Sequence, residues 1–204
     1  TLKIDRSFVN SIVDDDGNSV REKNGYLVIK SPWPAMTRGL LHDDDRYIKT
    51  YWSRFENIWF HGDYVFADSD NLWYMHGRTD DVINVSGHRM STSEIEHIVI
   101  SHKKISDAAS ISIPDAITGE AIVVFFVADK KKYTNLEFEV IEHISKRIGK
   151  IAKPKYVFQL SDLPKTRTGK IMRRLLKTKL MGEELGDLSS LENPEILKEI
   201  SKLN

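Results

Sequence analysis

Cysteine is absent from this 204-residue chain, which excludes disulfides, thiolate metal sites and cysteine nucleophiles. No apolar run approaches the length that would cross a bilayer, so no membrane segment is predicted. Glycine and proline are scarce, with 11 and 6 residues, while 40% of the chain is hydrophobic. This composition predicts a globular protein with a real core rather than a disordered or low-complexity chain.

A secretory signal is also missing, because residues 1–6 show no basic stretch followed by an apolar one. Together with the lack of cysteine, this favours a cytoplasmic location. The first residue is Thr1 rather than Met, which leaves room for a natural start upstream. Thirty basic residues balance thirty acidic ones, and this neutrality argues against a dedicated nucleic-acid-binding protein.

The aromatic residues are unevenly distributed. Residues 1–80 hold all 4 Trp and most of the 7 Tyr, and the longer remainder holds few aromatics. Such a change in composition predicts a domain boundary near residue 80.

The first region is predicted to be rich in β structure. Residues 8–13, 26–30, 59–66 and 72–75 have strand-like composition, and acidic turn sequences at 14–18 and 68–71 suggest hairpins. Three aspartates at residues 43–45 predict the start of a helix, since carboxylates favour the positive end of the helix dipole.

The second region alternates between helix and strand. Capping-box patterns predict helices that begin near Ser91 and near Thr134, the second of which ends near Gly149. Strands are expected at residues 108–113, where Pro114 would end the strand, and at 121–128 and 156–158. A basic amphipathic helix is predicted to carry Ile171, Met172, Leu175 and Leu176. The fold class is therefore α+β, a β-rich subdomain followed by a small α/β domain with helices packed on a short sheet.

Common catalytic motifs are absent. Residue 171 is not Ser or Thr, so Gly169 and Lys170 do not complete a phosphate loop, and no G-x-G-x-x-G or G-x-S-x-G occurs. The seven histidines form no H-E-x-x-H pattern, so each is interpreted as a surface or packing residue and no metal site is predicted.

Residues 165–179 contain seven basic residues and no acidic ones. Such a cluster can be a solvated face, a nucleotide or phosphate site, or a nucleic-acid surface, and composition alone leaves all three open. The flexible Gly169 directly before Lys170 favours the anion site, because the loop could bring the ammonium to a ligand.

Two segments carry a family resemblance: GRTDDVINVSGHR at residues 77–89, followed by SEIE at 93–96, and PKTRTGKIMRR at 164–174. They resemble the signatures of the adenylate-forming (ANL) superfamily, which includes acyl-CoA synthetases, peptide-synthetase adenylation domains and luciferases. The segments SPWP (31–34), YIKTYW (47–52) and GDLSSLENPE (186–195) are similar to the AMP-forming acetyl-CoA synthetases in particular.

The resemblance implies that this chain is the C-terminal part of such an enzyme. Residues 1–79 would be the closing β-rich subdomain of the large adenylating domain, and residues 80–204 the mobile C-terminal domain. Family members are longer and carry the ATP phosphate loop and the acyl pocket in the large domain. The chain alone is therefore expected to be inactive.

The resemblance also assigns roles in the first half-reaction, in which acetate and ATP give acetyl-adenylate and pyrophosphate. Lys170 matches the catalytic lysine between the substrate carboxylate and the α-phosphate. Asp63 matches the aspartate that accepts hydrogen bonds from the ribose hydroxyls. Arg78 matches an arginine on the ribose and phosphate side, and Arg89 one near the phosphates.

The second half-reaction transfers acetyl to CoA and releases AMP. Asp80 matches the hinge about which the C-terminal domain rotates between the two steps. Ser86 and Gly87 match the loop that lines the pantetheine tunnel. Lys146 and Arg147 lie near the region that binds the CoA phosphates, where Ser145 replaces the arginine typical of the family.

The implied substrates are acetate, ATP with Mg²⁺, and CoA, with no prosthetic group. A lysine acetyltransferase and deacetylase acting on Lys170 are implied partners, whereas nucleic acid and membrane are not. Another short- or medium-chain acyl-CoA synthetase, such as a propionyl type, and a stand-alone regulatory or interaction module remain the alternatives.

Overall fold

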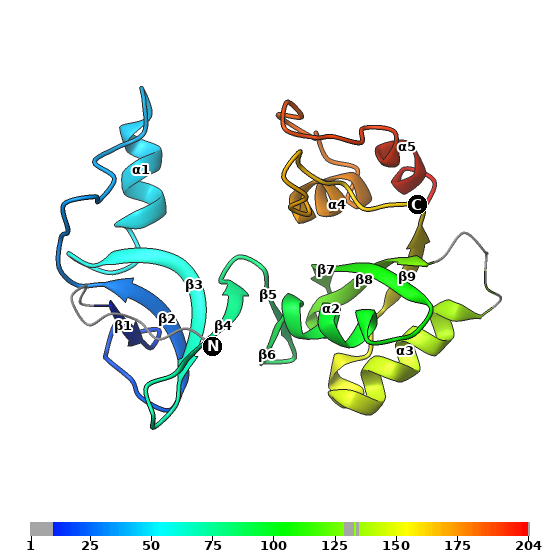
Figure 1. Ribbon diagram of the computed structural model, residues 1–204, viewed down its shortest axis with the longest axis horizontal. Coiled ribbons are helices and arrows are strands. Elements are labelled where there is room, and N and C mark those ends of the chain that lie inside the picture. Colours follow the sequence, from blue (N-terminus) through cyan, green and yellow to red (C-terminus); the bar gives the residue numbers. More distant parts are fainter. Residues whose placement is uncertain (1–9, 129–132, 134, 204) are drawn as a thin grey trace. The chain divides into compact units, whose positions relative to one another are not determined.

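The computed structural model describes residues 10–128, 133 and 135–203. The chain divides into two compact units, the first ending at Asp80 and the second starting at Asp81 (Figure 1). The sequence-based boundary between residues 79 and 80 lies one residue from this division. The roles given to the two regions, and the hinge at Asp80, stay predictions.

The first unit is a four-stranded antiparallel sheet in which each strand pairs with the next along the chain. Its strands are β1 (Asn10–Val13), β2 (Asn24–Ile29), β3 (Trp59–Ala67) and β4 (Trp73–Arg78). The predicted strands and hairpins are confirmed, although Phe8 and Val9 lie outside the described residues.

Aspartates close both predicted turns of this sheet. The Asp14 carboxylate accepts hydrogen bonds from the backbone N–H groups of Asp16 and Asn18, at 3.1 and 2.9 Å. Asp68 accepts the N–H of Leu72 at 2.8 Å in the β3–β4 turn. These side chains satisfy backbone donors locally, which is why short Asp-rich segments form the turns.

Helix α1 (Asp44–Tyr51) begins where the three aspartates predict, and the Asp43 carboxylate accepts the N–H of Arg46 at its N-terminus. The Tyr51 ring stacks on Trp59 with 4.3 Å between centroids, and Trp33 and Trp52 meet the same indole edge-on. The aromatic excess of residues 1–80 therefore includes a cluster that holds α1 against β3.

The second unit is a five-stranded sheet in the order β6-β5-β8-β7, in which β9 pairs with β8 in parallel. Its strands are β5 (Val82–Val85), β6 (His88–Ser91), β7 (Ile105–Asp115), β8 (Gly119–Ala128) and β9 (Tyr156–Leu160). Its helices are α2 (Thr92–Ile100), α3 (Leu136–Arg147), the short 3₁₀ turn η1 (Lys150–Ala152), α4 (Arg173–Leu180) and α5 (Ile196–Ile200).

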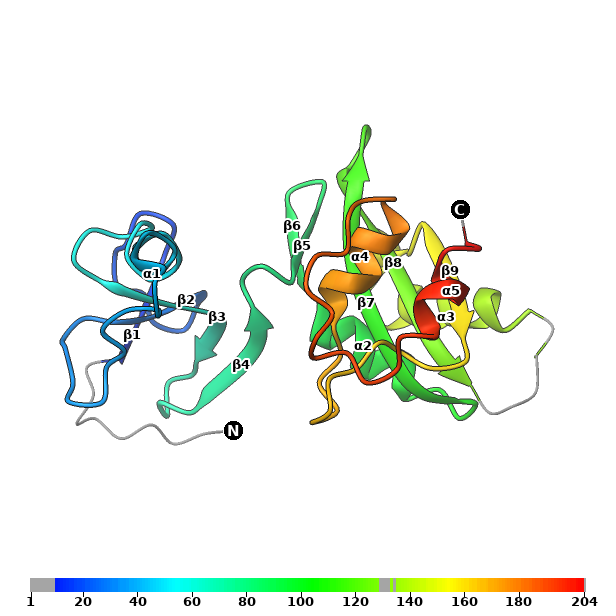
Figure 2. The same cartoon turned by 90° about the horizontal axis from the view of Figure 1, so that it is seen from above.

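Strand β8 is buried on both faces, which explains its unbroken apolar run. Its alternating side chains serve two separate cores, because neighbouring strand residues point to opposite faces. Val124 and Phe126 pack with α2 and α3, whereas Val123 and Phe125 pack with α4 and α5. The two helix pairs lie on opposite faces of the sheet (Figures 1 and 2), so the predicted α+β class is confirmed.

Three expectations about this unit are corrected. Strand β7 continues through Pro114, which pairs opposite Glu120; an edge strand tolerates the missing N–H. Helix α2 starts at Thr92, but the Ser91 side chain makes no capping hydrogen bond. Ile171 and Met172 precede α4, because the N–H of Met172 bonds to the carbonyl of Pro164 instead of to a helix.

The other predicted elements of the second unit are present. The helix at 136–147 precedes a left-handed Gly149, and Thr134 lies outside the described residues. The β5–β6 hairpin was not predicted as a pair of strands. Among the helices of the described ranges, none has the length and apolar character needed to cross a membrane.

Replacing Phe125 by Ala should destabilise the second unit by about 3–5 kcal/mol, because this fully buried ring fills the core under α4 and α5. Urea unfolding followed by far-ultraviolet circular dichroism measures the loss. All four tryptophans lie within residues 1–80, so tryptophan fluorescence should report an unchanged first unit. Phe138→Ala, on a side chain that is 69% exposed, is the matched control and should change stability little.

Candidate functional site

Asp63 lies in β3 directly opposite Arg78 in β4. One carboxylate oxygen lies 2.7 Å from Nδ1 of His61, and the other lies 3.7 Å from Nη1 of Arg78. Arg78 also donates to the carbonyl of His61 at 3.1 Å and to the Asp80 carboxylate at 3.2 Å. The first unit therefore brings together three predicted site residues, Asp63, Arg78 and Asp80, around one guanidinium.

Gly62 makes this arrangement possible. Its φ of +89° suits glycine, and a Cβ there would lie 2.6 Å from Nη2 of Arg78. The guanidinium of Arg78 therefore packs against the backbone at Gly62, between His61 and Asp63. The contact of Arg78 with Gly62 was not predicted from the sequence, and His61 was interpreted as a surface or packing residue. The available signal was the i,i+2 spacing of His61 and Asp63, which places both on one face of a strand.

Lys170 ends a tight loop in the second unit. Its backbone carbonyl accepts the N–H of Thr166 at 2.9 Å, and the N–H of Gly169 donates to the carbonyl of Thr166 at 2.8 Å. Below the loop, Lys165 and Ile171 form an antiparallel bridge. Gly169 has a φ of +83°, the left-handed conformation that closes the turn.

Most of the basic run is held by acceptors. Arg173 makes a bidentate pair with the buried carboxylate of Glu96, at 2.9 and 2.6 Å, and that contact raises the pKa of the guanidinium. Lys165 contacts Asp107 at 2.8 Å and Asp162 at 3.1 Å, and the Asp107 hydrogen bond raises its pKa. The remaining held residues are Arg167, Arg174 and Lys177.

Lys170 differs from these five, as does Lys179 near the end of α4, which has no hydrogen-bond or ion-pair partner among the described residues. The Lys170 side chain is exposed, and its ammonium makes no hydrogen bond or ion pair with any residue that the structure describes. The basic run presents Lys170 on a loop that paired neighbours hold in place.

Ser86 and Gly87 form the two-residue turn between β5 and β6. Their φ values are +50° and +83°, typical of the type I′ turn that matches strand twist. The N–H of Ser86 donates to the carbonyl of Thr118 at 2.9 Å, which fixes the tip. A Cβ on Gly87 would meet nothing within 4 Å in this chain, so here the backbone conformation is what requires glycine.

The other predicted site residues of the second unit lie on β6 and α3. Arg89 is exposed on β6, opposite Asn84. Lys146 and Arg147 are exposed in the last turn of α3, which covers the face of the sheet opposite α4, and Lys146 pairs with Glu142 at 3.1 Å. Ser145, the residue before Lys146, has a buried hydroxyl with no partner among the described residues.

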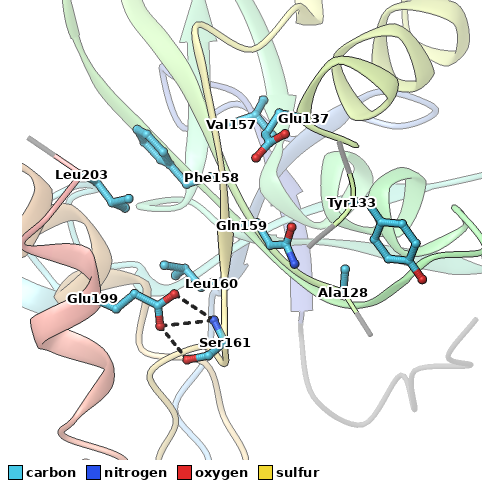
Figure 3. Close-up of a pocket in the computed structure, with 10 residues that line it drawn as sticks. All are labelled: Ala128, Tyr133, Glu137, Val157, Phe158, Gln159, Leu160, Ser161, Glu199 and Leu203. Carbon is cyan, nitrogen blue, oxygen red and sulfur yellow. Dashed lines mark hydrogen bonds between the residues drawn. The ribbon is translucent and has the colours of Figure 1, made fainter. Parts of the chain in front are cut away.

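A hollow of about 670 Å³ lies beside β9, between α5 and the start of α3 (Figure 3). Glu199 on its wall accepts hydrogen bonds from the Ser161 backbone and hydroxyl (Figure 3). None of the predicted site residues lines it, so it is separate from the candidate site. Across the described ranges, no three metal-ligating side chains gather closely enough to hold a metal ion.

Part of the second unit matches a known domain family. Residues 94–170 match the family model of the AMP-binding enzyme C-terminal domain. This span contains most of helix α2, strands β7 to β9, helix α3 and the loop up to Lys170.

Whole-chain comparison is more specific. The chain is 46% identical over 199 residues to an acetyl-coenzyme A synthetase of Pyrobaculum arsenaticum, covering 96% of this chain and 30% of that protein. It is 40% identical over 200 residues to the acetyl-coenzyme A synthetase of Methanothrix thermoacetophila, covering 95% and 30%. Residues 94–170 thus carry an AMP-binding enzyme C-terminal domain, and the similarity over almost the whole chain agrees with the C-terminal part of an acetyl-CoA synthetase that the motifs predict. It spans about 30% of the length of these relatives.

The fold agrees. The structure of an acetoacetyl-CoA synthetase from Streptomyces lividans matches with a TM-score of 0.83 at 23% identity, covering 96% of this chain and 30% of that one.

The Arg173–Glu96 pair should be important for stability of the second unit. Arg173→Met removes the cation from a carboxylate whose side chain is only 9% exposed, and we expect a loss of about 3 kcal/mol in the free energy of unfolding. Arg174→Met is the matched control, because that neighbouring guanidinium is exposed and donates, within the described ranges, to the neutral carbonyls of Leu185 and Asp187. Equal losses for the two variants in urea unfolding would contradict this interpretation.

Proposed function

We propose that this chain is the C-terminal part of an AMP-forming acetate–CoA ligase. The enzyme would activate acetate with ATP to acetyl-adenylate and pyrophosphate, then transfer the acetyl group to CoA and release AMP. The observation that carries the proposal is the unpaired ammonium of Lys170 on a loop whose neighbouring cations are paired. The 40–46% identity to acetyl-CoA synthetases supports the same reaction.

Lys170 would act in the first half-reaction. An acetate oxygen attacks the α-phosphorus of ATP, and pyrophosphate leaves with the electrons of the broken P–O bond. Two anions must approach, so a positioned cation lowers the barrier by stabilising charge that gathers on the phosphoryl oxygens. Lys170 is suited to this because no residue of the described chain neutralises its ammonium.

Asp63, Arg78 and Arg89 would bind the nucleotide. The Asp63 carboxylate would accept hydrogen bonds from the ribose hydroxyls, and its contacts with His61 and Arg78 hold it in a defined orientation. Arg78 would contact the ribose and phosphate side, and Arg89 the phosphates. ATP would enter with Mg²⁺, and no prosthetic group is required by this chemistry.

The second half-reaction would use other residues of the same chain. The CoA thiol attacks the acyl carbon, and AMP leaves as its bond to that carbon breaks. Ser86 and Gly87 would line the pantetheine path, and Lys146 and Arg147 would approach the CoA phosphates. Asp80 would be the hinge between the two arrangements, since the chain divides into its two units between Asp80 and Asp81.

Regulation and location follow from the same assignment. Acetylation of Lys170 by an acetyltransferase would remove the charge needed for adenylation, and a deacetylase would restore it. A cytoplasmic enzyme is expected.

Lys170→Ala in the complete synthetase should reduce acetate-dependent ATP–pyrophosphate exchange by about 10²–10³-fold, the usual effect of losing a donor that stabilises charge in the transition state. Transfer of acetyl from supplied acetyl-adenylate to CoA should continue at the parent rate, because the lysine serves only the first step. Lys177→Ala, on an exposed lysine of α4, is the matched control and should leave both reactions unchanged. Equal loss of both half-reactions in Lys170→Ala would contradict the assignment.

A further inference from the structure

One residue holds both backbone groups of Lys170. The N–H of Lys170 donates to the hydroxyl of Thr166 at 3.1 Å, while its carbonyl accepts the N–H of Thr166 at 2.9 Å. The same hydroxyl lies 3.0 Å from the hydroxyl of Thr168. Thr166 therefore fixes the place from which the Lys170 side chain starts.

Thr166 is itself held from outside the loop. It forms an antiparallel bridge with Leu191, and the next residue of that segment, Glu192, donates its N–H to the carbonyl of Lys165 at 2.9 Å. Asn193 accepts the N–H of Lys165 at 3.1 Å through its side chain. The C-terminal segment thus braces the base of the loop at Lys165 and Thr166.

The tip of the loop has weaker support, an exposed ion pair at 3.7 Å between Arg167 and Glu192. Residues 167–170 are all exposed, and a Cβ on Gly169 would meet nothing within 4 Å. Few buried contacts restrain such a segment, and an exposed ion pair contributes little, so the hydrogen bonds to Thr166 are the main limit on its motion. A lysine side chain is long and flexible, and any freedom of its backbone adds to that of the ammonium.

We propose that the Thr166 hydroxyl is a positioning residue for Lys170 in adenylate formation. The base of the loop is fixed by residues 191–193, and the hydroxyl of Thr166 holds the Lys170 backbone against that base. The ammonium is therefore confined to a small volume before the substrates bind. Preorganisation of this kind raises the rate without adding a contact to the substrate. The inference rests on the proposed role of Lys170.

The test uses Thr166→Val and Thr166→Ser in the complete synthetase. Valine keeps the shape of threonine and removes the hydroxyl, whereas serine keeps the hydroxyl. Thr168→Val is the matched control, because that hydroxyl lies in the same loop and makes no contact with the Lys170 backbone. Each variant is assayed for acetate-dependent ATP–pyrophosphate exchange and for acetyl transfer from supplied acetyl-adenylate to CoA.

We expect Thr166→Val to lower kcat of the exchange reaction by about tenfold, the scale of one hydrogen bond. Its KM values for ATP and acetate and its rate of acetyl transfer should stay at parent values, Thr166→Ser should restore most of the exchange, and Thr168→Val should change it little. Full exchange in Thr166→Val, no rescue by serine, or equal loss of both half-reactions would overturn the inference. Lys170→Ala is measured in parallel: if it loses exchange while Thr166→Val does not, only the role of Thr166 is wrong. If Lys170→Ala keeps full exchange, the proposed role of Lys170 is wrong, and the inference falls with it.

Discussion

The burial of β8 on both faces is the constraint on which the second unit depends. Alternate side chains of one strand build two cores, so helices must cover both sides of the sheet. Different predicted site residues therefore lie on the two faces of the sheet. The α4 face carries the loop of Lys170, while the α3 face carries Lys146 and Arg147. The burial of β8 on both faces therefore places Lys170 on the opposite side of the sheet from Lys146 and Arg147.

Charge is distributed by the same logic. The zero net charge of the chain conceals a basic run, of which Lys165 and Arg173 form partly buried ion pairs. Glu96 accepts from Arg173 and from the N–H of Ser110, so one buried carboxylate joins α2, β7 and the start of α4. Composition alone gives the seven cations equal weight, and the structure distinguishes Lys170 because it is the cation of the loop whose side chain has no described partner, whereas Lys179, also without one, lies in α4.

Sequence patterns predicted the helices, strands and turns well wherever residues close in the sequence determine the local structure. The Asp-rich turns, the acidic start of α1 and the apolar run of β8 each form as expected. Patterns failed where tertiary context decides: Pro114 remains in an edge strand, and Ile171 and Met172 are held out of α4 by the loop that closes on Pro164. The motif residues Asp63, Arg78 and Lys170 were found through resemblance. Their partners Gly62 and Thr166 were not predicted, because contacts across strands or loops have no fixed spacing in the sequence, and His61 was overlooked although its i,i+2 spacing to Asp63 was visible.

The central claim is that this chain supplies the C-terminal part of an acetate-activating synthetase. The most direct measurement joins residues 1–204 to the preceding part of the Pyrobaculum arsenaticum acetyl-CoA synthetase, in place of the matching 30% of that protein, and assays acetate-dependent ATP–pyrophosphate exchange. The account predicts exchange by the hybrid and none by the 204-residue chain alone. A folded hybrid without exchange, beside an active parent enzyme, would contradict it, and so would exchange by the isolated chain.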